Sequence, residues 1–130
     1  MAGTQYSLLV VDDNEMNRDL LSRRLERQGY RVTVAVDGRQ ALEFLRQEPF
    51  SLVLLDIMLP EMNGYQVLEH LKADDSLSHI PVIMTTALDE ADGKQKCLDL
   101  GAHDYFTKPF NPVQLKARII DCLERDAPSP

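Results

Sequence analysis

The chain lacks the features that mark disulfide-rich, membrane-spanning, exported or nucleic-acid-binding proteins. Its 130 residues include no tryptophan, two cysteines and six glycines. No apolar run approaches the length that spans a bilayer, and the first residues lack the basic and apolar segment of an export signal. Basic residues are also scarce, 14 against 21 acidic ones, which gives a formal net charge of -7. We therefore expect no direct contact with nucleic acid or with a membrane, because both present anionic groups.

The two cysteines, Cys97 and Cys122, both lie in helix-like stretches. This low content indicates a reducing, cytoplasmic compartment. A reactive thiol pair stays open as an interpretation, but two packed structural cysteines are favoured. The three histidines share no spacing and are interpreted as surface or structural residues: His70, His79 and His103.

Strand-like and helix-like segments alternate five times along the chain. The predicted strands are 7–11, 31–36, 51–55, 81–85 and 104–107. The predicted helices are 14–29, 38–47, 65–73, roughly 90–100 and 112–125. This alternation is typical of an α/β fold with a parallel sheet and right-handed crossovers. We expect one domain over residues 6–125, followed by a linker or disordered tail at 126–130.

Apolar residues at helical spacing predict which helix faces are packed. In the first helix these residues are Met16, Leu20, Leu21 and Leu25. In the last helix they are Val113, Leu115, Ile119, Ile120 and Leu123. The charged residues from Arg18 to Arg27 are predicted to form a solvated helix face.

Polar side chains stand where the predicted strands end. Asp12 and Asp13 follow the first strand, Asp56 the third, Thr86 the fourth and Lys108 the fifth. The carboxyl ends of parallel strands meet at one edge of the sheet, where ligands bind in open α/β folds. Three carboxylates packed without a counterion would repel one another, so the set favours a hard divalent cation. Oxygen ligands without histidine or thiol indicate Mg²⁺ more than Zn²⁺.

Each of these residues also has an ordinary explanation when it is considered alone. An aspartate after a strand is more often a helix cap, and Thr86 or Lys108 alone signifies nothing. Their joint placement carries the signal, because a carboxylate can attack phosphorus while a metal ion and a lysine neutralise the transferring group. The set therefore favours phosphoryl transfer to Asp56.

Four segments give the chain its resemblance to a known family. These are LLVVDDN, LVLLDIMLPEMNG, PVIMTTA and GAHDYFTKPF. Together they resemble the receiver domain of two-component response regulators over about residues 6–125. The resemblance implies a doubly wound, flavodoxin-like fold with a five-stranded parallel sheet in the order 2-1-3-4-5 and five helices.

The resemblance also implies a role for each matched residue. Asp56 corresponds to the phosphoacceptor. Asp13, Asp56 and the backbone carbonyl of Met58 would hold Mg²⁺, or alternatively Mn²⁺, and Asp12 would reach the ion largely through water. Lys108 would pair with Asp56 or with its phosphoryl group.

Further positions would serve the conformational switch and the lifetime of the signal. Thr86 matches the hydroxyl that moves toward the phosphoryl group, and Tyr105 matches the aromatic side chain that swings inward with it. The bond between Lys108 and Pro109 is cis in the family. Met58 and Leu88 flank the site and are apolar, so we expect slow hydrolysis of the aspartyl phosphate.

The expected function is that of a phosphoacceptor switch in a two-component or phosphorelay system. The phosphodonor would be a sensor histidine kinase or a histidine phosphotransfer protein, and the chain would catalyse its own phosphorylation and slow dephosphorylation without being a conventional enzyme. A partner, an output domain or a second copy would bind the face formed by the fourth helix, fifth strand and fifth helix.

Two other functions share parts of this pattern. A pseudo-receiver that binds partners without phosphorylation would usually lose one of the site residues, and all of them are present. A phosphohydrolase of the haloacid dehalogenase kind needs a second acid two residues after the nucleophile, where this chain has Met58.

Overall fold

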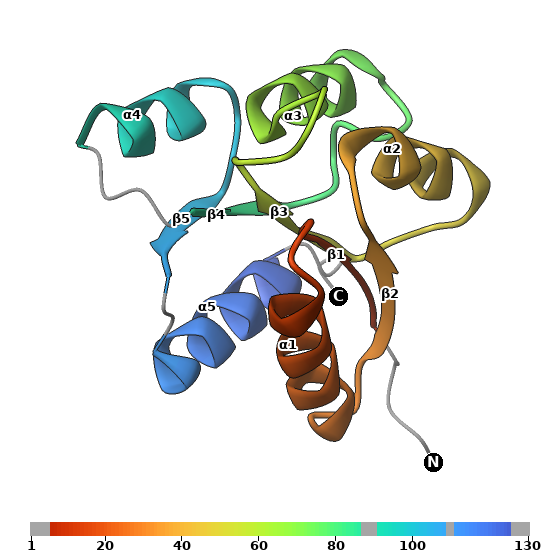
Figure 1. Ribbon diagram of the computed structural model, residues 1–130, viewed down its shortest axis with the longest axis vertical. Coiled ribbons are helices and arrows are strands. Elements are labelled where there is room, and N and C mark those ends of the chain that lie inside the picture. The colour runs from red at the N-terminus through yellow and green to blue at the C-terminus, as the bar shows by residue number, and fades with distance from the viewer. Residues whose placement is uncertain (1–5, 87–90, 109–110, 126–130) are drawn as a thin grey trace.

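The computed structural model describes residues 6–86, 91–108 and 111–125. Its five strands form one parallel sheet in the order β2-β1-β3-β4-β5 (Figure 1). The strands are β1 Ser7–Val11, β2 Arg31–Ala35, β3 Leu52–Asp56, β4 Val82–Thr86 and β5 Asp104–Thr107. The helices are α1 Glu15–Arg27, α2 Gly38–Gln47, α3 Gly64–Ala73, α4 Ala91–Asp99 and α5 Pro112–Arg125. The predicted fold, including its strand order, is confirmed.

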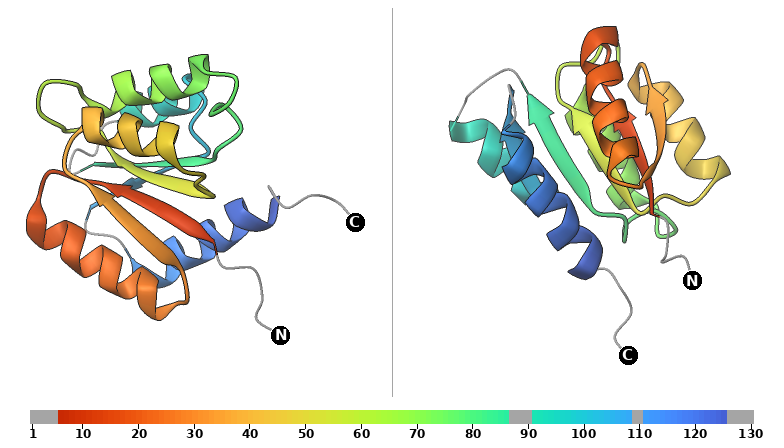
Figure 2. Two further views of the ribbon diagram at one scale, coloured as in Figure 1. Left: turned by 90° about the vertical axis from the view of Figure 1, so that its right-hand side faces the viewer. Right: turned by 90° about the horizontal axis from the view of Figure 1, so that it is seen from below.

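The helices cover both faces of the sheet. α1 and α5 lie on one face, and α2, α3 and α4 lie on the other (Figures 1 and 2). Successive strand residues point to opposite faces, so Leu8 and Leu54 pack toward α1 and α5 while Leu9 and Leu55 pack toward α2 and α3. Burial on both sides explains why β1, β3 and β4 have nearly continuous apolar sequences.

Short polar caps start three of the helices close to the strand ends. The side chains of Asn14, Asp37 and Asn63 each accept a hydrogen bond from a backbone N–H in the first turn of the helix that follows. At α3 the cap is reciprocal, because the side-chain oxygen of Gln66 accepts a hydrogen bond from the backbone N–H of Asn63. These caps keep the connections at the carboxyl edge of the sheet short and defined.

Two strands extend one residue beyond their predicted ends. Asp56 is the last residue of β3, where it is in register with Thr85. Thr86 is the last residue of β4 and is in register with Thr107, although it was predicted to lie just past the strand. Ladder pairing with the neighbouring strand therefore fixes the backbone of both residues.

The predicted packed faces of α1 and α5 are partly wrong. Met16 is 71% exposed, Leu20 is 61% exposed, and Val113 on α5 is 76% exposed. Leu25 and Ile119 are fully buried, as predicted. Leu20 and Leu21 are consecutive and point about 100° apart, so only one of them can face the sheet.

The cysteines and histidines lie where the structural interpretation placed them. Cys97 is buried in the core on the α2, α3 and α4 side, whereas Cys122 is buried in the core on the α1 and α5 side. The sheet separates the two thiols, which excludes a pair between them. His70, His79 and His103 are exposed. Among the described residues, no helix is long and apolar enough to cross a membrane.

Candidate functional site

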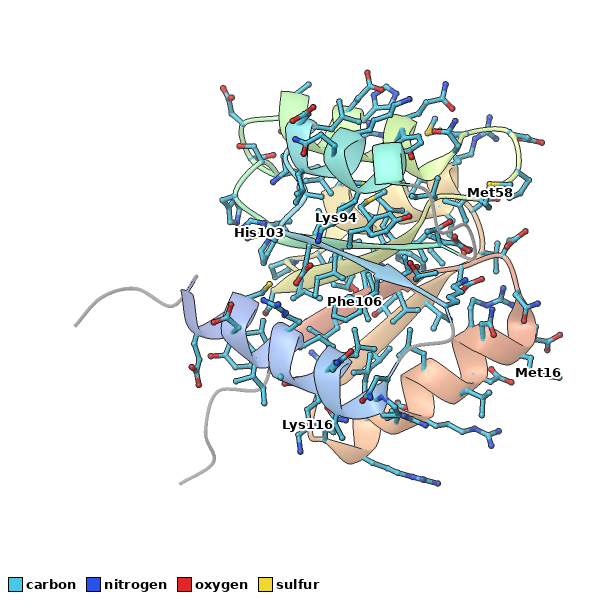
Figure 3. The ribbon with its side chains drawn as sticks, turned by 90° about the vertical axis from the view of Figure 1, so that its left-hand side faces the viewer. Met16, Met58, Lys94, His103, Phe106 and Lys116 are labelled. Carbon is cyan, nitrogen blue, oxygen red and sulfur yellow. The ribbon has the colours of Figure 1, made fainter. Side chains whose placement is uncertain are left out.

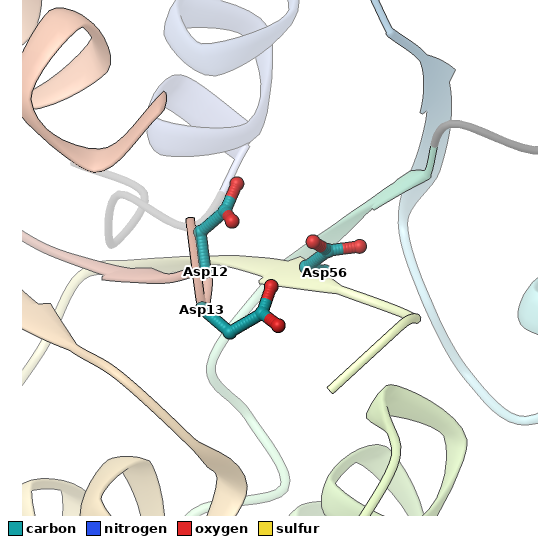
Figure 4. Close-up of side chains that lie close together, drawn as sticks. All are labelled: Asp12, Asp13 and Asp56. Carbon is teal, nitrogen blue, oxygen red and sulfur yellow. The ribbon is translucent and has the colours of Figure 1, made fainter. Parts of the chain in front are cut away.

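The three carboxylates predicted from the strand ends lie together at the carboxyl edge of the sheet. β1 and β3 are paired neighbours, so Asp12 and Asp13 after β1 lie beside Asp56 at the end of β3. One carboxylate oxygen from each residue lies within 4.8 Å of those from the other two. Figure 4 shows the Asp13 carboxylate directed toward Asp56, with Asp12 beside them. This spacing suits shared coordination of one cation.

Asp56 is held in a nearly enclosed position. Only 4% of this residue is exposed. Its Oδ1 accepts a hydrogen bond from the N–H of Met58 at 3.1 Å, and its Oδ2 lies 3.0 Å from the Nζ of Lys108. Burial raises the pKa of Asp56 above its ordinary value and Asp12 adds to the rise, although Lys108 and the Met58 N–H oppose it. The site thus holds a charge that is only partly compensated.

Lys108 connects two of the carboxylates. Its Nζ lies 2.7 Å from Oδ2 of Asp12 as well as 3.0 Å from Asp56. Burial alone would lower the pKa of Lys108, but its hydrogen bonds and charge contacts with the two aspartates outweigh burial and raise that pKa. The backbone N–H of Lys108 also donates to the carbonyl of Thr86 at 2.7 Å. Lys108 is therefore a charged ammonium fixed to the end of β4.

Asp12 and Asp13 differ in how firmly they are held. Oδ1 of Asp12 accepts from the N–H of Asn14 at 2.8 Å, Oδ2 binds Lys108, and the Asp12 N–H donates to the carbonyl of Ala35. Asp13 is exposed, and its side chain has no hydrogen bond or ion pair among the described residues. Asp12 is thus a fixed carboxylate, and Asp13 is one that a ligand can engage without breaking a protein contact.

A glycine closes the loop that follows Asp56. The N–H of Gly64 donates to the carbonyl of Ile57 at 2.8 Å. A Cβ at position 64 would lie 2.3 Å from the carbonyl oxygen of Asp56 and 2.7 Å from the Cα of Ile57. Only glycine permits this approach between the start of α3 and the end of β3. The same loop contains Glu61 at a φ of 64°, a conformation that non-glycine residues seldom adopt.

The remaining predicted residues surround this centre to different extents. Thr86 is fully buried at the end of β4, and Tyr105 on β5 is partly buried against the core on the α4 side. Met58 is 55% exposed at the mouth of the site. Leu88 and Pro109 lie outside the described residues, so the structure bears on neither the role of Leu88 nor the isomer of the bond before Pro109.

Sequence reasoning missed the contact between Lys108 and Asp12, and it also missed a contact from α1. Arg18 was placed on a solvated face, but it is only partly exposed, and its Nη1 donates to the backbone carbonyl of Asp12 at 2.8 Å. Residues 18, 21 and 25 recur at helical spacing, so Arg18 belongs to the stripe of α1 that carries Leu21 and Leu25. That spacing was the available signal.

Comparison with known proteins decides the family. The family described as "Response regulator receiver domain" matches residues 8–120, most of the chain. This chain is a response regulator receiver domain. It is 41% identical over 121 residues to a probable transcriptional regulator, ycf27, of Cyanidium caldarium, a match that covers 93% of this chain and 47% of the relative. This receiver domain thus spans about half the length of the probable transcriptional regulators that it resembles.

Solved structures place the fold of this receiver domain in the same family. A putative response regulator from Chloroflexus aurantiacus superposes with a TM-score of 0.90 at 30% identity, covering 94% of this chain and all of that one. The receiver domain of a sensor histidine kinase from Pseudomonas aeruginosa superposes with a TM-score of 0.85 at 29% identity, covering 93% and 99%. That structure has a magnesium ion coordinated in its active site cleft.

Proposed function

We propose that this receiver domain is a phosphoacceptor switch in which Asp56 takes a phosphoryl group from a phosphohistidine, in a reaction that requires Mg²⁺. The observation that carries the proposal is the position of Asp56 at the end of β3, with two further carboxylates and the Lys108 ammonium around it. Family membership supports a role in two-component signalling. The relatives named as transcriptional regulators support an output in gene control.

The proposed reaction replaces one bond to phosphorus by another. A carboxylate oxygen of Asp56 attacks the phosphorus, an O–P bond forms, and the N–P bond to the donor imidazole breaks. The imidazole nitrogen leaves with the bonding electron pair and takes up a proton. Lys108 would hold the carboxylate in place and then contact an oxygen of the transferred group, because its Nζ already lies 3.0 Å from Asp56.

The donor set of the site fits a magnesium ion. Three carboxylates converge, two from one turn and one from a buried strand end, and Lys108 is paired with only two of them. Asp13, Asp56 and the Met58 carbonyl would bind the ion directly, Asp12 would bind through water, and Mn²⁺ could replace Mg²⁺. When bound, the ion supplies positive charge that stabilises the oxygens of the transferring phosphoryl group.

Exposed apolar residues beside the site suit the approach of a protein donor. Met16 and Leu20 are the exposed large apolar side chains of α1, and together with Glu15, Asp19 and Arg23 they line a shallow groove. Figure 3 shows Met16 and Met58 at the same end of the molecule, on the two sides of the sheet. We propose that a cytoplasmic histidine kinase or histidine phosphotransfer protein docks there and presents its phosphohistidine to Asp56.

The proposed output is a change in the face formed by α4, β5 and α5. The Thr86 hydroxyl would turn toward the phosphoryl group, and Tyr105 would move further inward with it. Contacts that hold α4 in the present state include Lys96, whose Nζ lies 4.2 Å from the centre of the Tyr65 ring on α3. Phosphorylation would favour a second arrangement of this face, which then binds a partner, an output domain or a second copy.

Metal dependence tests the proposed function. Acetyl phosphate should phosphorylate the wild type in the presence of Mg²⁺ and should fail to do so in EDTA, as measured by intact mass. Asp13→Ala should lower the rate at least tenfold because it removes a charged ligand, whereas Asp75→Ala, at an exposed position, should react like the wild type. Equal rates for Asp13→Ala and the wild type at limiting Mg²⁺ would contradict the proposal.

A further inference from the structure

The guanidinium of Arg18 reaches back from α1 to the turn that carries two of the acids. Its Nη1 donates to the carbonyl oxygen of Asp12 at 2.8 Å, across the start of the helix. Among the described residues, no other arginine of α1 forms a hydrogen bond or ion pair with that turn. The long side chain thereby ties the first turns of α1 to the end of β1.

This contact completes the set of bonds that fixes Asp12. Its N–H is bound by β2, its Oδ1 by the N–H of Asn14, its Oδ2 by Lys108 and its carbonyl by Arg18. Asp13 is the next residue, and its side chain has no such bonds in the described structure. The direction of Asp13 toward Asp56 in Figure 4 is therefore set by the backbone of the turn.

We propose that Arg18 is a positioning residue for the cation site: its hydrogen bond to the Asp12 carbonyl holds the turn so that Asp13 faces Asp56. The inference rests on the proposed function, because it assumes that the three acids bind a divalent cation. Arg18 then has two opposite effects on the affinity for a cation. Its hydrogen bond strengthens cation binding, whereas its positive charge near the site weakens it.

The direction of the change in Mg²⁺ affinity separates the effect of the Arg18 charge from the effect of its hydrogen bond. If charge dominated, Arg18→Met would bind Mg²⁺ more tightly, because a repelling cation is removed. If positioning dominates, Arg18→Met binds Mg²⁺ more weakly, by about fivefold, the scale expected for a partly exposed hydrogen bond from a charged donor. Arg18→Lys keeps the charge and an N–H donor, so its affinity should lie within about twofold of the wild type. Arg18→Gln also removes the charge and is too short to reach the Asp12 carbonyl, so it should bind Mg²⁺ as weakly as Arg18→Met.

The experiment is a calorimetric titration of the purified chain with MgCl₂ alone. Arg24→Met is the matched control, because this substitution removes the same charge from an exposed residue in the last turn of the same helix. Urea unfolding without Mg²⁺ checks that each variant is folded, and Arg18→Gln takes the place of Arg18→Met if the latter does not fold. The amide of Asn14, followed by NMR, should shift in Arg18→Met and stay unchanged in Arg24→Met.

Weaker binding by Arg18→Met, near-normal binding by Arg18→Lys and wild-type binding by Arg24→Met support the assignment. Equal or tighter Mg²⁺ binding by Arg18→Met overturns the assignment of Arg18 but leaves the proposed function standing. An Arg18→Lys variant that binds Mg²⁺ no better than Arg18→Met has the same consequence. A wild type that binds no Mg²⁺ overturns both the assignment and the proposed function.

Discussion

Asp56 is the residue at which stability and function oppose each other. It is buried, it shares one ammonium with Asp12, and Asp13 lies close by. An uncharged side chain at this position would make the folded state more stable, because one lysine cannot compensate three neighbouring carboxylates. In the proposed function, the excess negative charge serves to bind a divalent cation.

Replacement of Asp56 by asparagine should therefore stabilise the fold in Mg²⁺-free buffer at neutral pH. The expected gain is on the order of 1 kcal/mol, the usual scale of a single substitution. Because the pKa of Asp56 is raised, folding favours its neutral form, and that stability is present below the ordinary aspartate pKa and is lost as pH rises through the folded-state value. The gain in Asp56→Asn should accordingly shrink as the pH falls.

Urea unfolding of both proteins between pH 3.5 and pH 7.5, roughly the range set by a raised aspartate pKa, measures this difference. Asp75→Asn, an exposed position, serves as the control and should change little. Added Mg²⁺ should stabilise the wild type and close the gap. A less stable Asp56→Asn at neutral pH without metal would show that the ion pair with Lys108 outweighs burial.

Met58 sets a second expectation at the residue scale, for the lifetime of the phosphoryl group. Its side chain is 55% exposed at the mouth of the site and cannot orient an attacking water by hydrogen bonding. The double variant Met58→Asn with Leu88→Glu should lose its phosphoryl group about tenfold faster, since one oriented hydrogen bond in the transition state is worth about 1 to 2 kcal/mol. First-order loss of label measures the rate, and Met16→Asn is the control. Decay at or below the wild-type rate would rule out this explanation.

At the scale of elements, β4 and β5 connect the site to the face that would change. Thr86 ends β4, its carbonyl accepts the N–H of Lys108, and Tyr105 lies on the adjoining strand beside Met84. A movement of Thr86 toward Asp56 therefore acts on the backbone that carries both Lys108 and β5. α4 and α5 pack on opposite sides of this edge of the sheet (Figure 1).

Replacement of Thr86 by alanine should separate phosphorylation from its structural consequence. The variant should still accept a phosphoryl group, but amide shifts over residues 91–118 should respond to a beryllofluoride mimic much less than in the wild type. Thr85→Ala is the matched control, because Thr85 is buried beside Thr86 on the same strand and points to the other face. Equal responses from Thr86→Ala and the wild type would show that the coupling runs through other residues.

At the scale of the whole molecule, periodicity and breakers were enough to predict the order of elements and the edge where the acids meet. Each buried strand is a short apolar run that ends on a polar residue, and this pattern does not depend on distant contacts. The resemblance supplied the strand order. Two features depend on packing and could not be predicted from the sequence. One is which of Leu20 and Leu21 faces the sheet, and the other is the contact of Lys108 with Asp12 as well as Asp56.

Arg18 shows the same limit at the site. Its charge suggested a solvated position, but its place on the stripe of Leu21 and Leu25 brings it against the end of β1. Helical spacing shows which residues share a face, whereas the partner of a long polar side chain depends on the three-dimensional position of a backbone carbonyl.

The most direct measurement of the central claim is the site of phosphorylation. The wild type and Asp56→Asn are incubated with acetyl phosphate and Mg²⁺, and the products are analysed by intact mass and peptide mapping. The account predicts one base-labile phosphoryl group on the wild type, located on Asp56 and lost in the variant, while Asp75→Asn is labelled like the wild type. Stoichiometric labelling of Asp56→Asn, or labelling of the wild type at another residue, would contradict it.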